Sequence, residues 1–338
     1  MTHCRKSYAI SSSPFFGLSS KKKLSELLGV SLHAITDLRQ SGLHRQYRIF
    51  KDRKTQRLIT EPVGELLRVH QKILKLFKRI QPPAYLHSAI KKRSYKTNAE
   101  AHLENRRTLK IDLKKFFPSI RFHHVYGFFL KNMQCSSDIA TILANLCTAN
   151  TKNHGTHLPT GSCISPLLSY WINQSLFDQL HDITSQEGCR MTLYVDDITI
   201  SGEKATPEFL NKIAIAINSY GYKYHKVACY GNGVATITGL IVNEGRLELP
   251  HARAQKIRSL EKELMETENY IDRKRILNSL MGRLAEAEQI VPAYTAKKNE
   301  IMKLFENIWD DIVQERARRA RLKRGIKKKP VLADISGV

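Results

Sequence analysis

Three aspartates stand at the ends of apolar, strand-like runs, where packing alone does not favour a carboxylate. Asp112 follows the apolar run at 108–111, while Asp196 and Asp197 separate two further apolar runs. The second pattern predicts a β-hairpin with both acids at its tip. Adjacent anions repel, so this pair favours a hard divalent cation, which prefers oxygen ligands. Taken singly, each acid has a structural alternative: a solvated Asp-Asp turn, or a turn-forming or helix-capping Asp112.

Together the acids support a chemistry that neither pattern supports alone. If Asp112 and Asp196 lie on neighbouring strands, they can hold two metal ions about 3.5 to 4 Å apart. One ion lowers the pKa of a primer hydroxyl and the other clamps a triphosphate, so that an in-line attack is stabilised at both the attacking and the leaving oxygen. The pattern therefore predicts nucleotidyl transfer with two Mg²⁺ ions, for which Mn²⁺ is the expected substitute.

The composition predicts a polyanionic partner. Lys and Arg total 55 of 338 residues against 31 Asp and Glu, a formal net charge of +24. Nucleic acid is the expected partner, and the alternatives are a merely soluble basic protein or one bound at a membrane surface. No stretch reaches the ~18 apolar residues of a membrane helix and no targeting signal is found, so a cytoplasmic location without membrane attachment is expected.

The spacing of cysteine and histidine does not predict zinc. The six cysteines include no CxxC pair, which also argues against a disulfide framework and fits a reducing compartment. His154 and His157 lack neighbours at ligand spacing, so we interpret this stretch as a polar loop before Leu158.

The surrounding patterns predict a mixture of helices and strands. A helical pair over residues 22–40 superficially resembles a DNA-binding helix-turn-helix, but we interpret it as a packed edge of a larger domain. Other expected elements are a hairpin at 47–60, helices at 65–80, 123–131, 137–149, 165–181 and 207–220, a strand at 108–113, a loop at 150–160, a hairpin at 190–201, short strands at 222–227 and 235–242, and charged helices after Pro250.

Four blocks of residues resemble reverse transcriptases in both type and order. Residues 194–197, Tyr-Val-Asp-Asp, match the family's Tyr-x-Asp-Asp motif, and Asp112 matches its upstream aspartate. Residues 158–166, Leu-Pro-Thr-Gly-Ser-Cys-Ile-Ser-Pro, resemble the segment Leu-Pro-Gln-Gly-x-x-x-Ser-Pro, and residues 57–62, Arg-Leu-Ile-Thr-Glu-Pro, resemble Arg-x-Ile-x-x-Pro. The chain is therefore similar to RNA-directed DNA polymerases.

This resemblance implies an α+β right-hand polymerase fold with fingers, a palm of antiparallel sheet plus helices, and a helical thumb. Asp112, Asp196 and Asp197 are the implied catalytic residues and metal ligands, with Asp197 ligating less directly. The implied divisions are an N-terminal helical segment at 1–46, fingers and an RNA-contact region at 47–107, a catalytic palm with interleaved fingers at 108–245, a thumb at 246–315 and a basic tail at 316–338.

Five residues match positions that handle the nucleotide in the family. Phe117 matches an aromatic residue under the incoming sugar, where a bulky ring excludes a 2′-hydroxyl. Arg57 is implied to bind the triphosphate, and Gly161 to let backbone approach the nucleotide or template. Thr160 stands where the family usually has Gln, so nucleotide handling is expected to differ in detail. Lys226 resembles a later palm lysine that donates a proton or contacts phosphate.

Two further segments resemble retron reverse transcriptases. Residues 98–102 match Asn-Ala-x-x-His, and residues 237–239, Ile-Thr-Gly, are close to Val-Thr-Gly. Capping of a helix by the Asn or the His is the structural alternative. Ser165-Pro166 disfavours diversity-generating enzymes, and the fewer than about a hundred residues after Val242 are enough for a helical thumb. The resemblance implies RNA recognition by Asn98, His102, Thr238 and Gly239.

A retron enzyme copies part of a cognate structured noncoding RNA, primes from the 2′-hydroxyl of an internal guanosine and leaves a branched RNA–DNA molecule, msDNA. The implied partners are this RNA and its DNA copy, deoxynucleotides, host RNase H and an accessory effector in antiphage defence. Basic helical patterns at 253–268 and 271–287 fit an RNA grip, whereas the basic run at 316–329 is either RNA-binding or a solvated tail. Two other hypotheses remain: another bacterial group II intron-like reverse transcriptase, and a noncatalytic nucleic-acid-binding regulator.

Overall fold

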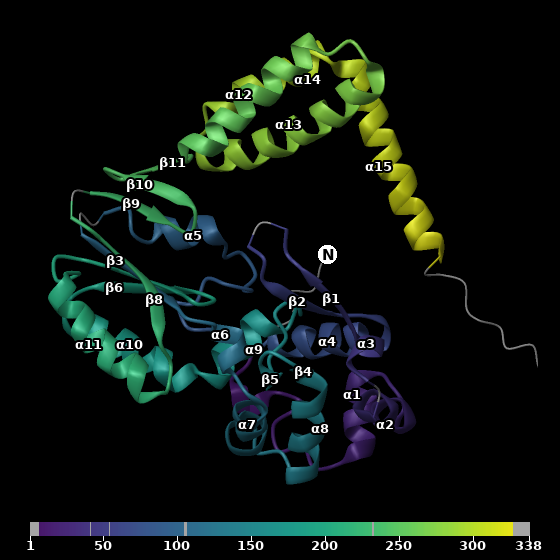
Figure 1. Ribbon diagram of the computed structural model, residues 1–338, viewed down its shortest axis with the longest axis vertical. Helices are drawn as coiled ribbons and strands as arrows, with labels where there is room; N and C mark the ends of the chain where they lie inside the picture. Colours follow the sequence, from purple (N-terminus) through teal and green to yellow (C-terminus); the bar gives the residue numbers. More distant parts are fainter. Residues whose placement is uncertain (1–6, 41, 54, 105–106, 232, 327–338) are drawn as a thin grey trace, which may run out of the picture. The chain divides into compact units, whose positions relative to one another are not determined.

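The computed structural model describes residues 7–326, with the exception of 41, 54, 105, 106 and 232. The chain divides into two compact units, Met1–Arg246 and Leu247–Val338. Figure 1 traces the chain through both units and labels their helices and strands. Among the helices of the described range, none is long and apolar enough to cross a membrane.

A four-stranded antiparallel sheet lies at the centre of the larger unit. Its strand order is β6-β7-β3-β8, with bounds Arg190–Tyr194, Asp197–Ser201, Thr108–Leu113 and Tyr224–Tyr230. Leu109, Ile111 and Ile198 are fully buried, because alternate side chains of a strand point to one face and this face is covered. Helices α10, Gln174–Gln186, and α11, Pro207–Ser219, lie along the sheet (Figure 1).

The remaining elements of the larger unit follow the predicted pattern in most places. The helical pair ends its first helix at Gly29, whose φ of +70° suits glycine, and Ser20 caps the start by accepting the Lys23 N–H. The bounds are η1 Ile10–Ser12, α1 Lys21–Leu28, α2 Leu32–Gln40, α3 Leu43–Gln46, β1 Tyr47–Lys51, β2 Leu58–Pro62, α4 Gly64–Phe77, α5 Tyr95–Glu100, α6 Phe116–Ser119, α7 Phe122–Gly127, η2 Phe128–Asn132, α8 Ser137–Cys147, β4 Ala149–Thr151, β5 Gly155–His157, α9 Ser165–Ile172, β9 Val234–Ile237 and β10 Leu240–Asn243; β11, Arg246–Glu248, spans the boundary between the units.

Three predictions of secondary structure are wrong in detail. The loop expected at 150–160 contains the β4–β5 hairpin, and Gly155 supplies its left-handed turn with φ of +62°. The helix expected at 165–181 breaks at Asn173, whose side chain bonds to the Ser169 carbonyl and to the Tyr222 hydroxyl. The strand expected at 235–242 is the β9–β10 hairpin, which turns at residues 238 and 239.

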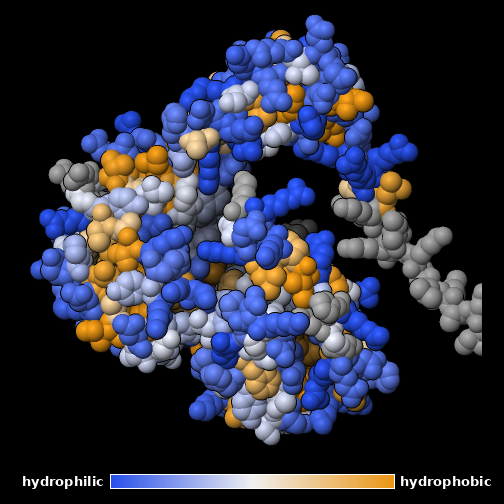
Figure 2. Space-filling view, in the orientation of Figure 1, coloured by the Kyte–Doolittle hydropathy of each residue, from blue (hydrophilic) through white to orange (hydrophobic). Residues whose placement is uncertain are grey.

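The smaller unit is helical, as predicted for the chain after Pro250. Its helices are α12 His251–Glu266, α13 Tyr270–Ile290, α14 Tyr294–Leu304 and α15 Glu306–Ile326. Its own apolar core includes Ile257, Leu264, Leu277 and Leu284, each at most 2% exposed. Hydrophilic side chains cover most of the visible surface of this unit in Figure 2. The tail expected from residue 316 is helical as far as 326, while residues 327–329 of the basic run lie outside the described residues.

Candidate catalytic site and two hairpin turns

Two carboxylates and a lysine stand in one row across the central sheet. Asp112 in β3 pairs directly with Asp197 in β7 on one side and with Lys226 in β8 on the other. Directly paired residues of antiparallel strands carry their side chains on the same face. The row therefore brings together Asp112 and Asp197, and it places Lys226, exposed at the surface, beside them.

The third aspartate lies in the turn that joins β6 to β7. Val195 and Asp196 form a two-residue loop, across which Tyr194 pairs with Asp197. Val195 has a φ of +63°, a left-handed conformation that β-branched residues rarely adopt. The turn is held on both sides, because the Val195 N–H donates to Ser88 Oγ at 3.1 Å and the Asp196 carbonyl accepts the Leu113 N–H at 3.1 Å.

The aspartates are half-buried and repel one another. Burial, and then the charge of Asp112, raises the pKa of Asp196 to about 6; the charge of Asp197 adds to this shift and that of Arg57 opposes it. Burial also raises the pKa of Asp197, an effect that the charge of Lys110 opposes. The pKa shift of Asp196 therefore shows that the three acids lie within electrostatic range of one another.

Two basic side chains contact the acids directly. Lys110 Nζ lies 3.8 Å from Asp197 Oδ1, and His225 Nδ1 lies 3.7 Å from Asp112 Oδ1. Sequence reasoning missed both residues. Lys110 could have been found from the alternation of β3, since it lies two residues before Asp112 and must share its face. Nothing in the local pattern around His225 points to Asp112.

The donor set fits a hard divalent cation in its chemistry. All three side chains offer carboxylate oxygens, and a cation would relieve the repulsion that contributes to the raised pKa of Asp196. Among the residues that the structure describes, however, no three acidic, histidine or cysteine side chains are grouped closely enough to hold one ion together. The three acids thus lie in one region of the structure, but their side chains are not arranged as a complete set of ligands for one ion.

Arg57 and Phe117 reach this place from two different segments. Arg57 is exposed in the loop between β1 and β2, close enough for its charge to act on Asp196. Phe117 lies in α6, immediately after β3, where Lys115 with a φ of +50° turns the chain from strand to helix. The Phe117 ring is half-buried, with its centroid 5.9 Å from that of Phe116.

Thr160 and Gly161 form a tight junction with strand β2. The Thr160 hydroxyl donates to the Leu58 carbonyl at 2.8 Å and accepts the Thr60 N–H at 3.2 Å, while the Thr160 N–H donates to the Thr60 hydroxyl at 3.1 Å. A Cβ on Gly161 would stand 2.7 Å from Ile59 Cγ2. The close approach predicted for Gly161 is therefore present, but its partner is a strand of the same chain. Contact of either residue with a nucleotide stays a prediction.

The segment that matches Asn-Ala-x-x-His lies in and just after α5, with its polar side chains buried. His102 is fully buried, with Nδ1 2.6 Å from Ser201 Oγ and Nε2 2.7 Å from Thr192 Oγ1. Burial lowers the pKa of His102 to about 3, so the ring is neutral. Asn98 is also fully buried, and neither polar atom of its side chain has a hydrogen-bond partner among the described residues. Direct RNA contact by these two side chains stays a prediction.

The segment Ile-Thr-Gly forms the turn of the β9–β10 hairpin. Thr238 and Gly239 are the two loop residues, with φ of +44° and +78°, as in the type I′ turns that suit hairpins. The Thr238 hydroxyl donates to the Tyr95 carbonyl at the start of α5, at 2.7 Å. The second segment is therefore bonded to the first residue of α5, the helix in which the first segment begins.

Comparison with known proteins agrees with this geometry. Residues 43–227 match the family described as reverse transcriptase (RNA-dependent DNA polymerase). The chain belongs to this family. The matched range contains the three aspartates, Arg57, Phe117 and Lys226.

The curated relatives include several retron enzymes. The chain is 32% identical over 195 residues to the Retron Se72 reverse transcriptase of Salmonella heidelberg, covering 55% of this chain and 49% of the relative. It is 26% identical over 278 residues to the Retron Mx162 reverse transcriptase of Myxococcus xanthus, covering 71% and 56%, and 24% identical over 290 residues to the Retron Ec73 reverse transcriptase of Escherichia coli, covering 78% and 88%. The chain thus spans about half the length of the first two relatives. These similarities confirm the predicted resemblance to retron-type reverse transcriptases.

Proposed function

We propose that this protein is an RNA-directed DNA polymerase of the retron type. The observation that carries the proposal is the row of Asp197, Asp112 and Lys226 across the central sheet, with Asp196 in the adjoining turn. This row lies inside the range that matches the reverse transcriptase family. Acids that repel one another at the open face of a sheet are suited to metal-assisted phosphoryl chemistry.

In this proposal, Asp112, Asp196 and Asp197 are the catalytic residues and ligate divalent metal, with Asp197 ligating less directly. Bound Mg²⁺, or Mn²⁺ in its place, supplies electrostatic stabilisation at the attacking and leaving oxygens of the α-phosphate. Lys226 stands beside Asp112, where an ammonium group can contact phosphate or donate a proton. The cation on Arg57, which already acts on Asp196, binds the triphosphate.

The nucleotide lies, in the same proposal, over the junction between β3, α6 and the loop at 158–161. The half-buried ring of Phe117 meets the sugar and excludes a 2′-hydroxyl. Gly161 keeps the loop close to β2, and Thr160 replaces the long amide of the usual Gln with a hydroxyl that is bonded to Leu58 and Thr60. The nucleotide therefore has less side chain to contact at position 160 than in the family's usual pattern.

The retron assignment adds a substrate and its partners. The template is part of a cognate structured noncoding RNA, priming starts from the 2′-hydroxyl of an internal guanosine, and the product is msDNA. Host RNase H removes template, and an accessory effector joins the complex in antiphage defence within the cytoplasm. Support comes from the relatives and from the bond between Thr238, in one retron-like segment, and Tyr95, in the helix where the other segment begins. Gly239 and the region around Asn98 and His102 belong to the same recognition surface.

Primer extension tests the enzymatic part. Purified protein with a primed RNA template, deoxynucleotides and Mg²⁺ should extend the primer, and Asp196→Asn should lower the rate at least about a thousand-fold, because the loss of a metal ligand removes stabilisation present mainly in the transition state. Asp182→Asn is the matched control, since Asp182 is 74% exposed on α10. Extension that persists in Asp196→Asn would refute the site, and a noncatalytic regulator predicts no extension by any variant.

The nucleic acid that copurifies with the protein tests the retron part. A molecule in which RNA is joined to DNA by a 2′,5′ bond is the expected result, detected by its resistance to alkali at the branch and its release by a debranching enzyme. Linear nucleic acid alone, from cells that also contain the neighbouring noncoding RNA, would favour another bacterial reverse transcriptase.

A further inference from the structure

We propose that Ser88 is a positioning residue for the catalytic turn: its hydroxyl holds Val195 in the left-handed conformation that aligns Asp196 with Asp112. The inference rests on the proposed function, because its consequence is measured as polymerisation. The structural part, however, concerns one hydrogen bond between two segments 107 residues apart in the sequence.

Ser88 ends a short stretch of chain that pairs with the edge of the central sheet. The His87 N–H donates to the Leu193 carbonyl at 2.9 Å, and the Leu193 N–H donates to the Tyr85 carbonyl at 2.8 Å. These bonds lock the stretch beside β6 up to the point where β6 turns. The N–H of Val195, two residues after Leu193, pairs with no strand. It donates instead to the hydroxyl of Ser88, a residue that is only 2% exposed.

The turn is a place where such support matters. A β-branched residue with positive φ persists only when its surroundings determine its conformation, and here Val195 takes the conformation that glycine would adopt more readily. The residue after it is a carboxylate that two neighbouring carboxylates repel. Both the backbone strain and the repulsion act to move the turn, and the bond from Val195 to Ser88 opposes this movement.

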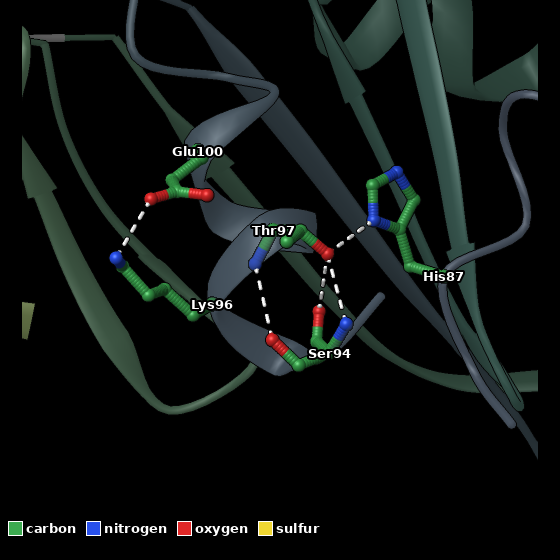
Figure 3. A network of polar contacts seen from close by, with 5 residues as sticks. All are labelled: His87, Ser94, Lys96, Thr97 and Glu100. Atoms are coloured by element: carbon green, nitrogen blue, oxygen red, sulfur yellow. Dashed lines mark hydrogen bonds and ion pairs between the residues drawn. The ribbon is translucent and has the colours of Figure 1, made fainter. Parts of the chain in front are cut away.

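The residues just before Ser88 are held by contacts that lead into α5. His87 Nδ1 lies 2.9 Å from the Thr97 hydroxyl, which accepts the Ser94 N–H at 2.9 Å in the capping box of α5 (Figure 3). Burial lowers the pKa of His87 to about 4, so this contact does not change charge near neutral pH. Arg93 donates to the Leu86 carbonyl at 2.6 Å, which fixes the backbone just before Ser88. The support of the catalytic turn is thereby continuous with α5.

Substitution of Ser88 tests the proposal. Ser88→Ala leaves the Val195 N–H unpaired, and displacement of a catalytic group by a fraction of an ångström is enough to lower kcat for single-nucleotide addition about ten-fold. The Mg²⁺ concentration for half-maximal rate should rise, while the KM for deoxynucleotide changes less than about two-fold. Ser88→Cys fills a similar volume with a weaker hydrogen-bond acceptor, so its kcat should lie between those of wild type and Ser88→Ala. Ser13→Ala is the matched control, because Ser13 is 5% exposed and also accepts a backbone N–H, that of Phe15.

A double variant separates positioning from general folding. Val195→Gly removes the strain of the left-handed residue, so Ser88→Ala should lower kcat less in the Val195→Gly background than in the wild type. A purely structural Ser88 would give the same loss in both backgrounds. Equal losses, or a Ser88→Ala enzyme within two-fold of wild type in kcat and Mg²⁺ dependence, would overturn the proposal.

Hydrogen exchange supplies a readout that does not need activity. The Val195 amide should exchange at least about ten-fold faster in Ser88→Ala, while the Leu193 amide, which bonds to the Tyr85 carbonyl, keeps its rate. An unchanged Val195 amide would refute the hydrogen bond itself. A wild-type protein that incorporates no deoxynucleotide, yet shows faster Val195 exchange in Ser88→Ala, would count against the proposed function and leave the positioning role of Ser88 in place.

Discussion

Two hairpin turns of the larger unit hold a β-branched residue in the left-handed region, and they are tied down in different ways. At Val195, φ +63°, the backbone N–H makes the tie, to Ser88, and at Thr238, φ +44°, the side-chain hydroxyl makes it, to the Tyr95 carbonyl. In the first turn the next residue is Asp196, and in the second it is Gly239. A tie through the backbone leaves the neighbouring side chains free for chemistry, whereas a tie through the side chain joins the turn itself to α5.

The regions around the two turns also shift the pKa of an ionisable side chain in opposite directions. Around the first, burial and neighbouring charge raise the pKa of Asp196 to about 6, so its ionised form destabilises the fold. The second turn is bonded to α5, and His102 lies two residues after the end of this helix. Burial lowers the pKa of His102 to about 3, and its neutral ring is bonded to two hydroxyls. The ionised form of Asp196 therefore destabilises the first region, whereas the second region is stable only while His102 is neutral.

The largest effect is expected for the loss of folding stability as His102 is protonated at acidic pH. Its folded pKa lies below the usual 6.5, so the stability that it contributes is complete above pH 6.5 and is lost as the pH falls from 6.5 towards 3. This one group accounts for about 2 kcal/mol between pH 6.5 and pH 5. Urea denaturation over this range should show a shallower pH dependence for His102→Gln than for wild type.

The matched control for this experiment is His33→Gln, because the His33 side chain is 87% exposed. His33→Gln should keep the wild-type pH dependence. If the stability of His102→Gln depends on pH in the same way as that of wild type, protonation of His102 does not destabilise the α5 region, and the contrast with the Val195–Asp196 turn fails.

An effect of opposite sign is expected at the Val195–Asp196 turn. The folded pKa of Asp196 is raised, so its ionised form opposes folding above pH 6 and this penalty disappears as the pH falls from 6 towards 3.8. With EDTA at pH 7.5, Asp196→Asn should be more stable than wild type by up to about 3 kcal/mol, because a pKa raised by about two units corresponds to that much. Mg²⁺ should then raise the urea midpoint of wild type more than that of the variant. A variant that is less stable than wild type at pH 7.5 would show that the carboxylates do not repel one another in the folded state.

The two turns also show what could be predicted from sequence. The Asp-Asp hairpin and the strand that ends near Asp112 were predictable because alternation and β-forming residues are local signals. The break at Asn173 was not, because one of the two partners of its side chain, the Tyr222 hydroxyl, lies 49 positions away. The same limit applies to the junction of Thr160 with Thr60 and to the bond between Ser88 and Val195, whose partners are 100 and 107 positions apart. Such pairs follow from tertiary packing, which no local pattern encodes.

The smallest effect is expected at Thr238, and it tests whether the two turns have separate roles. Thr238→Val keeps the shape of the side chain but removes the bond to the Tyr95 carbonyl, which holds the turn against α5. Because RNA binding would then have to restore the position of the turn, at a cost of about 1 kcal/mol, we expect the affinity for the copurifying RNA to fall roughly five-fold. Thr238→Ser retains the hydroxyl and should bind as wild type does. Extension of an unrelated primed template should be unchanged in both variants, since Asp112 lies on β3 and Asp196 in the turn between β6 and β7, outside the β9–β10 hairpin. If Thr238→Val lowers extension as much as it lowers RNA binding, α5 transmits the disturbance to Ser88 and the catalytic turn, and the two turns act as one site.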